Sequence, residues 1–149
     1  MNDQLPMPAI SLITLGVEDL AVSLAFYRAL GFRDTTASQD SVKFLNAGNI
    51  VLGLFARDEL ARDAHVDNQP TGFAAQSLAM NLPDEASTEA MFARAIAAGG
   101  TELKQPQKVF WGGYSGYFAD PDGHLWEVAH NPFFEMDANG TLRLESKSQ

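Results

Sequence analysis

The chain has 149 residues, of which 46% are hydrophobic and 19% charged, a balance that favours one folded domain and excludes a disordered or collagen-like chain. Ten Lys and Arg residues stand against 19 Asp and Glu, giving a net charge of −9 that repels nucleic-acid phosphates and anionic lipids. The absence of cysteine excludes disulfides and thiolate metal ligands. No signal peptide or membrane-spanning run is recognisable, so we expect a cytoplasmic protein without nucleic-acid or membrane partners.

The first 56 residues read as a strand, a helix and three more strands. Residues 10–17 alternate in polarity as a strand does, and Asp19 then offers an N-cap to a helix that Gly31 ends. The buried stripe of this helix follows three-and-four spacing. Shorter strands are expected at 32–36, 42–45 and 50–55.

The same order of elements then repeats. A polar joint at 57–73, with one helical turn, is followed by a strand at 77–82, a helix at 84–98 and strands at 101–109, 116–119 and 125–130. The chain is therefore expected to be one domain of two modules, about 9–56 and 74–131, with a loosely held polar tail at 137–149.

The repeat can be checked by register. Asp19 lies 65 positions before Asp84, while Gly48 and Leu52 lie 75 positions before Gly123 and Glu127. We therefore expect a longer loop in the second module, and this loop contains Trp111. Two such modules are best joined with their sheets side by side, helices on the outer face and a cleft on the inner face.

Two motifs carry a family resemblance. They are Leu15 to Phe32, with Asp19, Phe26, Tyr27 and Gly31 at fixed places, and the segment from Phe118 to Glu127 around Asp120-Pro121-Asp122-Gly123. Together they resemble the vicinal oxygen chelate superfamily of glyoxalases, bleomycin-resistance proteins and extradiol dioxygenases. The resemblance implies an α+β fold of two βαβββ modules that form a cup-shaped mixed sheet, and frequent homodimers. In metal-dependent members it also implies a divalent ion held by four side chains.

The resemblance places those four ligands at Leu12, Ser77, Leu52 or its neighbour Gly53, and Glu127. Only Glu127 is a good ligand, because leucine has no lone pair and a serine hydroxyl binds weakly. His124 and His130 fall on the opposite face of their strand from Glu127, and His65 lies in the joint. We therefore expect no metal cofactor.

Glu127 has two interpretations. Buried among apolar neighbours, its pKa would rise and it could act as a general acid or base. Alternatively, it anchors a hydrogen-bond network with Thr14, Ser77 or an arginine. The predicted ligand-binding set shares the inner face or its mouth: Leu12, Thr14, Leu52, Ser77, Trp111, Tyr114 and Glu127.

The nine positions 110–118 include five aromatic residues and three glycines. The functional interpretation is a flap whose Trp111 and Tyr114 stack on an apolar ligand, and the alternative is that these rings fill a seam or a dimer contact. Phe118 is expected in the core. Residues 120–123 are expected to form a type I turn without a catalytic role.

Three functions remain open. The leading hypothesis is a metal-independent protein that binds a small, partly apolar ligand in the cleft, in the manner of bleomycin-resistance proteins, and forms a homodimer. The alternative is a metal-independent isomerase or lyase with Glu127 as general base. The second alternative is a divalent-metal-dependent lyase or dioxygenase.

Overall fold

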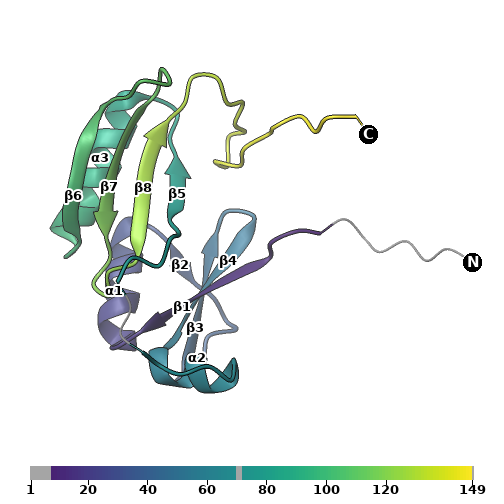
Figure 1. The fold of residues 1–149 in the computed structure, drawn as a ribbon, viewed down its shortest axis with the longest axis vertical. Helices are drawn as coiled ribbons and strands as arrows, with labels where there is room; N and C mark the ends of the chain where they lie inside the picture. Colours follow the sequence, from purple (N-terminus) through teal and green to yellow (C-terminus); the bar gives the residue numbers. More distant parts are fainter. Residues whose placement is uncertain (1–7, 70–71, 149) are drawn as a thin grey trace, which may run out of the picture.

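The computed structural model describes residues 8–69 and 72–148, and they form two modules of one strand, one helix and three strands (Figure 1). The first module comprises β1 (Leu12–Val17), α1 (Leu20–Leu30), β2 (Arg33–Asp34), β3 (Val42–Ala47) and β4 (Ile50–Ala56). A short helix, α2 (Arg57–Asp63), begins the joint. The second module comprises β5 (Leu78–Asn81), α3 (Glu85–Ala97), β6 (Thr101–Lys108), β7 (Tyr114–Ala119) and β8 (Leu125–His130).

Each module builds its own mixed four-stranded sheet. Sheet A has the order β1-β4-β3-β2 and sheet B the order β5-β8-β7-β6, with β1 and β5 parallel to their neighbours and the other pairs antiparallel. The predicted α+β fold of two βαβββ modules is thereby confirmed. The two sheets do not join into one, so β1 and β5 are each an edge strand.

The helix ends follow the sequence signals. The Asp19 side chain accepts hydrogen bonds from the backbone N–H groups of Ala21 and Val22, and α1 ends at Gly31, whose φ of 108° suits glycine. Asp84 and Ser87 form a capping box at the start of α3. Both predicted helix caps are confirmed.

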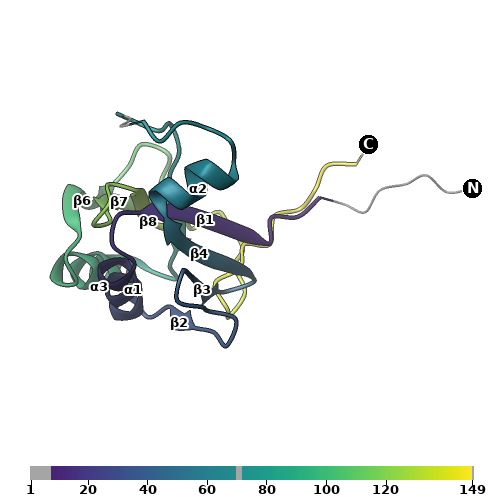
Figure 2. The same ribbon diagram turned by 90° about the horizontal axis from the view of Figure 1, so that it is seen from below.

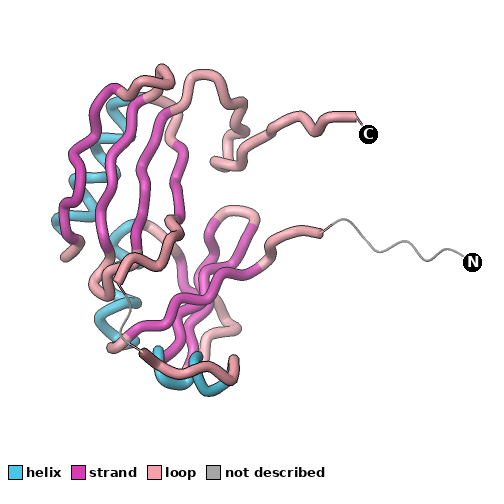
Figure 3. The backbone as a smooth tube through the Cα atoms, in the orientation of Figure 1, coloured by secondary structure: helices cyan, strands magenta, loops and turns pink. Residues whose placement is uncertain are grey.

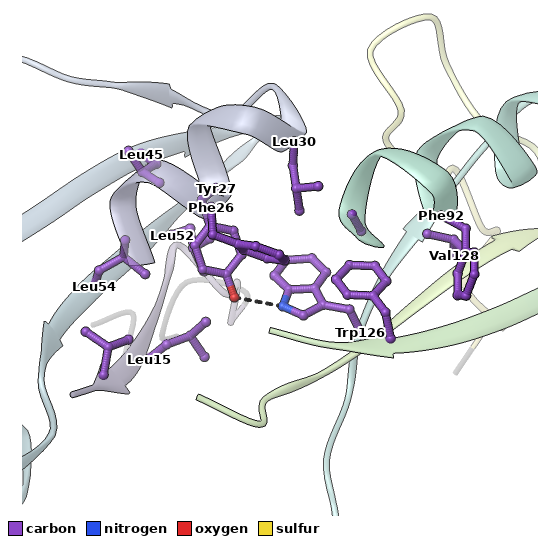
Figure 4. Packing of buried hydrophobic residues seen from close by; sticks show 13 residues of the cluster. Leu15, Phe26, Tyr27, Leu30, Leu45, Leu52, Leu54, Phe92, Trp126 and Val128 are labelled. Carbon is purple, nitrogen blue, oxygen red and sulfur yellow. Dashed lines mark hydrogen bonds between the residues drawn. The ribbon is translucent and has the colours of Figure 1, made fainter. Parts of the chain in front are cut away.

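The hydrophobic core is shared by the two modules. It gathers the helix-facing side chains of both sheets and of both helices (Figure 4). Phe26 of α1 packs against Phe118 of β7, with ring centroids 6.2 Å apart, and Tyr27 against Trp126 of β8 at 5.7 Å. Phe118 is fully buried, as predicted.

A buried hydrogen-bond chain reinforces this contact. The Trp126 indole N–H donates to the Tyr27 hydroxyl at 3.0 Å, and that hydroxyl donates to Asp120 Oδ2 at 2.6 Å. Burial, followed by the Asp120 carboxylate, raises the pKa of Tyr27 far above its ordinary range, so the phenol stays protonated. The network joins α1 of the first module to the end of β7 in the second.

The shared core determines which way the sheets face. In Figure 2, α1 and α3 lie side by side next to both sheets, and their contact is a direct one. We call the sheet face that carries no helix the inner face. The helix-bearing faces of both sheets contribute to one core, and the two inner faces lie on the sides of the sheets that this core does not cover.

The joint and the tail carry the remaining structure. Figure 3 shows loop after α2 up to residue 69 and loop again from residue 72 to the start of β5. In the tail, Met136 bridges Leu142 and Asp137 forms an ion pair with Arg143 at 3.0 Å. No helix within 8–69 and 72–148 is long and apolar enough to cross a membrane.

Candidate functional site on the inner face of sheet B

Strand register decides which residues share a face with Glu127. In sheet B, Leu78 pairs with Trp126 and Ala79 with Glu127, whereas in sheet A Ile13 pairs with Leu52. Ile13 and Leu78 are equivalent positions, so the counterpart of Leu52 is Trp126, and that of Gly53 is Glu127. The predicted equivalence of Leu52 and Glu127 is therefore wrong by one residue.

Leu52 consequently leaves the candidate site. It is 1% exposed and belongs to the core, because a one-residue shift in register moves a side chain to the opposite face of its sheet. The shift arises in the hairpins. Ala47 and Ile50 enclose two turn residues, while Ala119 and Leu125 enclose five.

The inner face of sheet A carries two other predicted residues. A Cβ atom at Gly53 would lie 3.1 Å from Thr14 Oγ1 and 3.4 Å from Leu12 Cδ1, so these three residues adjoin. Ser77 is exposed just before β5 of sheet B. The structure thus separates Leu12 and Thr14 from Ser77 and Glu127 onto different sheets, and their part in ligand binding stays a prediction.

A row of four inner-face positions crosses sheet B. Ala79 of β5 pairs with Glu127 of β8, Glu127 with Tyr117 of β7, and Tyr117 with Lys104 of β6. Glu127 and Tyr117 are half-buried, and Lys104 is exposed. A carboxyl, a phenol and an ammonium group therefore follow one another across three adjacent strands.

The pKa values of Glu127 and Tyr117 are both shifted by their position in this row. Burial raises the pKa of Glu127, although the Ser115 hydroxyl, the Lys104 charge and the Tyr117 hydroxyl favour its charged form. Burial, and then the Glu127 charge, raises the pKa of Tyr117. Such a carboxyl holds a proton more readily than a solvated one, which is a property of general acids and bases.

A hollow of about 400 Å³ adjoins the row. It is lined by Phe73, Ala75, Gln76, Ser77, Tyr117 and Leu125. Leu125 shares the inner face with Glu127, two residues further along β8. Phe73 is exposed and comes from the joint, so the hollow combines an apolar wall with the phenol of Tyr117.

Tyr117 and Phe73 were not predicted as site residues, and Tyr114, which was predicted to bind a ligand, lies away from this row. The Tyr114 hydroxyl donates to Glu89 of α3, which raises the pKa of the phenol to about 12 and places the side chain on the helix-bearing face. Strand alternation provided a usable signal. Tyr114 is four residues before the core residue Phe118, while Tyr117 has the opposite parity.

Trp111 lies in the turn between β6 and β7. Its ring covers Gly113 so closely that a Cβ atom there would lie 1.7 Å from the ring, and the side chain is 36% exposed. A Cβ atom at Gly112 would in turn lie 2.8 Å from the Phe133 ring. The predicted stacking of Trp111 on a ligand remains untested.

Residues 120–123 form a turn, as predicted, because the Gly123 N–H donates to the Asp120 carbonyl at 3.0 Å. The buried role of Asp120 was not predicted. Its side chain also accepts the N–H groups of Asp122 and His124 at 2.9 and 2.8 Å. Asp120 therefore organises both the turn and the contact between modules.

The three histidines lie away from Glu127. A ring nitrogen of His124 meets the Gly16 carbonyl at 2.8 Å, one of His130 meets the Leu82 carbonyl at 3.1 Å, and His65 is exposed after α2. In the described parts of the chain, no three His, Asp or Glu side chains are grouped as a metal site requires. The positions implied by the resemblance offer a leucine, a glycine, a serine and one carboxylate, which does not fit a four-ligand divalent ion.

Comparison with known proteins identifies the family. A profile described as the Glyoxalase/Bleomycin resistance protein/Dioxygenase superfamily matches residues 9–128, so the chain belongs to this superfamily. The resemblance seen in the motifs is confirmed. No curated protein matches the chain.

Solved structures agree with this assignment. A glyoxalase-related enzyme from Fulvimarina pelagi is 30% identical with a TM-score of 0.85, and the match covers 94% of this chain and 100% of that one. A lactoylglutathione lyase from Agrobacterium tumefaciens is 27% identical with a TM-score of 0.64, covering 85% and 96%. A glyoxalase/bleomycin resistance protein from Albidiferax ferrireducens T118 is 27% identical with a TM-score of 0.64, covering 83% and 98%.

Proposed function

We propose that this protein binds a small, partly apolar ligand on the inner face of sheet B, beside Glu127 and without a metal ion. The observation that carries the proposal is the hollow of about 400 Å³ next to a row of polar side chains. An apolar hollow with a few convergent polar groups and a perturbed carboxyl is typical of a ligand site.

The residue chemistry supports binding without a metal. The positions from which a chelating site would be built carry Leu12, Gly53 and Ser77 beside Glu127. The polar groups in and beside the hollow suit direct hydrogen bonding to an organic molecule. They are the Glu127 carboxyl, the Tyr117 and Ser77 hydroxyls and the Lys104 ammonium group.

A thermal-shift screen of small organic molecules tests this proposal. The protein is first dialysed against EDTA, and a ligand that binds the folded state raises the melting temperature by mass action. Hits are then repeated on Glu127→Gln and on Glu145→Gln, a matched control in the exposed tail. We expect Glu127→Gln alone to change the shifts. Hits that depend on added metal, or that ignore Glu127, would contradict the proposal.

Proton transfer is the second candidate function. It is favoured by the pairing of Glu127 with Tyr117, since both groups have raised pKa values and both lie on the inner face. Glu127 would remove a proton from a carbonyl-containing substrate, in an isomerase or lyase reaction. Under this hypothesis Glu127→Gln abolishes turnover while ligand binding persists. Unchanged turnover in Glu127→Gln would exclude it.

We also propose that the protein works as a homodimer whose second copy completes the cleft. Among residues 8–69 and 72–148, β1 and β5 each have one edge that no other strand pairs with, and such edges readily add a strand. Leu12 and Thr14 lie on sheet A and Glu127 on sheet B, and a second copy would bring the inner face of one sheet opposite that of the other. Pairing of β1 in one copy with β5 in the other would satisfy both conditions.

A further inference from the structure

The polar row on sheet B ends at the positively charged side chain of Lys104. Lys104 pairs with Tyr117 across β6 and β7, on the side away from Glu127. Among the described residues, its ammonium group forms no ion pair within 4.0 Å; the three ion pairs found there involve other residues. Lys104 is exposed and lies one strand beyond Tyr117, which lines the hollow, so its charge is free to meet an anionic group of a bound molecule.

We propose that Lys104 and Tyr117 form an anchoring subsite for a carboxylate group of the ligand, whose apolar part occupies the hollow between Phe73 and Leu125. This inference rests on the proposed function. The Lys104 ammonium donates charge-assisted hydrogen bonds to a carboxylate, and the Tyr117 hydroxyl, which bonds to Glu127 in the ligand-free protein, would turn to the ligand carboxylate as a second donor.

The geometry fits a molecule of defined length. Tyr117 belongs both to the wall of the hollow and to the row, whereas Lys104 lies one strand further, about 5 Å away. A ligand whose ring fills the hollow therefore reaches Lys104 with a chain of two or three carbon atoms. Tyr117 lies between Glu127 and Lys104 in the row, so the Lys104 end of the row is the one that suits an anion.

The register of β6 supplies a matched control. Lys108 lies four residues after Lys104 but pairs with Tyr114, because the pairing shifts between Lys104 and Gln107. Tyr114 bonds to Glu89 of α3, so Lys108 and Tyr114 mark the helix-bearing face. Lysine and tyrosine pairs thus occur on both faces of the same two strands, and only one pair adjoins the hollow.

The test compares 3-phenylpropanoate with its uncharged amide, 3-phenylpropanamide, by titration of backbone amide resonances in the whole protein. We expect the carboxylate to bind about tenfold more tightly than the amide, with shifts at β7, β8 and Lys104. Lys104→Met should remove this preference and leave amide binding unchanged. Tyr117→Phe should weaken binding of the carboxylate several-fold. The control variants Lys108→Met and Tyr114→Phe should leave the affinity for both ligands unchanged.

Equal affinity for the two ligands, or equal effects of Lys104→Met and Lys108→Met, would overturn the anchoring subsite. If both ligands bind equally and still shift the inner-face resonances, the proposed function stands and only the subsite fails. Shifts confined to other parts of the protein, or no binding of either probe, would contradict both.

Discussion

Glu127 is a carboxyl group that the fold holds at an energetic cost. Burial raises its pKa, so the folded protein binds the proton more tightly than the unfolded chain does. The charged form of Glu127 therefore destabilises the fold, and this penalty begins as the pH rises through the ordinary pKa of 4.5 and is complete above the raised value. Functional groups often reduce stability in this way.

Replacing Glu127 by glutamine should accordingly stabilise the protein at pH 7. We expect a gain of at most about 1 kcal/mol, because the side chain is partly solvated, and no gain below about pH 4. Urea unfolding of the wild type and Glu127→Gln between pH 4 and 8 measures the difference, with Glu145→Gln as the control. A loss of stability at pH 7 would instead identify Glu127 as a scaffold residue.

Tyr27 has the opposite character, because its hydroxyl is fully used in the core. Tyr27→Phe removes the donor to Asp120 and the acceptor for Trp126, leaving two buried polar groups short of a partner. We expect a loss of about 2 kcal/mol in the free energy of unfolding. Tyr114→Phe removes only an exposed hydrogen bond and should cost less than about 0.5 kcal/mol. Equal costs in urea unfolding would contradict the structural role of Tyr27.

The sequence placed Glu127 on the helix-free face of its sheet, where the structure also has it. It placed Leu52 and Tyr114 on the same face or at its mouth, whereas the structure has both on the helix-bearing side. Leu52 was misplaced because spacing between repeats cannot show where an insertion of a few residues occurs in a hairpin. Tyr114 was misplaced because the strand was expected to begin at 116 rather than at 114. In both cases the error is one of strand parity, which the observed pairing resolves.

Among the elements, the pairing of β6 with β7 does most to shape the site. Gly116 of β7 lies under an irregular part of β6, and a Cβ atom there would lie 2.7 Å from both the Lys104 carbonyl and the Pro106 nitrogen. These are backbone atoms and cannot simply move aside. The irregular pairing also brings Lys104 and Lys108 to opposite faces of sheet B.

Gly116→Ala should therefore destabilise the protein by about 2–3 kcal/mol and weaken ligand binding with it. Gly72→Ala is the matched control, because a Cβ atom at Gly72 meets nothing within 4 Å and its φ is not in the left-handed region. Urea unfolding followed by circular dichroism compares the two variants. Equal stability of Gly116→Ala and Gly72→Ala would contradict the close approach of β6 and β7.

The helices and most strands were predictable because each has a local signal. Asp19, Gly31 and Asp84 define the helix ends, and alternation defines the longer strands. The length of β2, only two residues, was not predictable, since its pairing depends on β3 rather than on its own composition. The turn at 137–141 in the tail was not predicted although it has a local signal, because Asp137 accepts the N–H groups of Asn139 and Thr141 and Gly140 supplies a positive φ.

For the whole molecule, the two modules and their repeat were evident from the sequence, but the direction of the two sheets was not. It depends on the shared core, and the core joins helix-bearing faces through Tyr27, Asp120 and Trp126. The same arrangement leaves the edges of β1 and β5 open, which motivates the proposed dimer.

Light scattering after size-exclusion chromatography tests the dimer directly. We expect a mass of twice 16.2 kDa at micromolar protein concentration. Ala79→Pro, on the edge strand β5, should reduce the mass to that of one chain, because proline disrupts strand pairing at an edge. Unchanged circular dichroism would show that the chain still folds. A wild-type protein that is monomeric at these concentrations would contradict the proposed assembly.

We propose above all that the inner face of sheet B binds a small organic ligand without a metal ion. The most direct measurement is a titration of the EDTA-dialysed, isotope-labelled protein with a hit from the thermal-shift screen, followed through its backbone amide resonances. Our account predicts the largest shifts at 115–117 and 125–129, with weakened or altered binding in Glu127→Gln. Shifts clustered outside sheet B, or binding that appears only when a divalent metal is added, would contradict it.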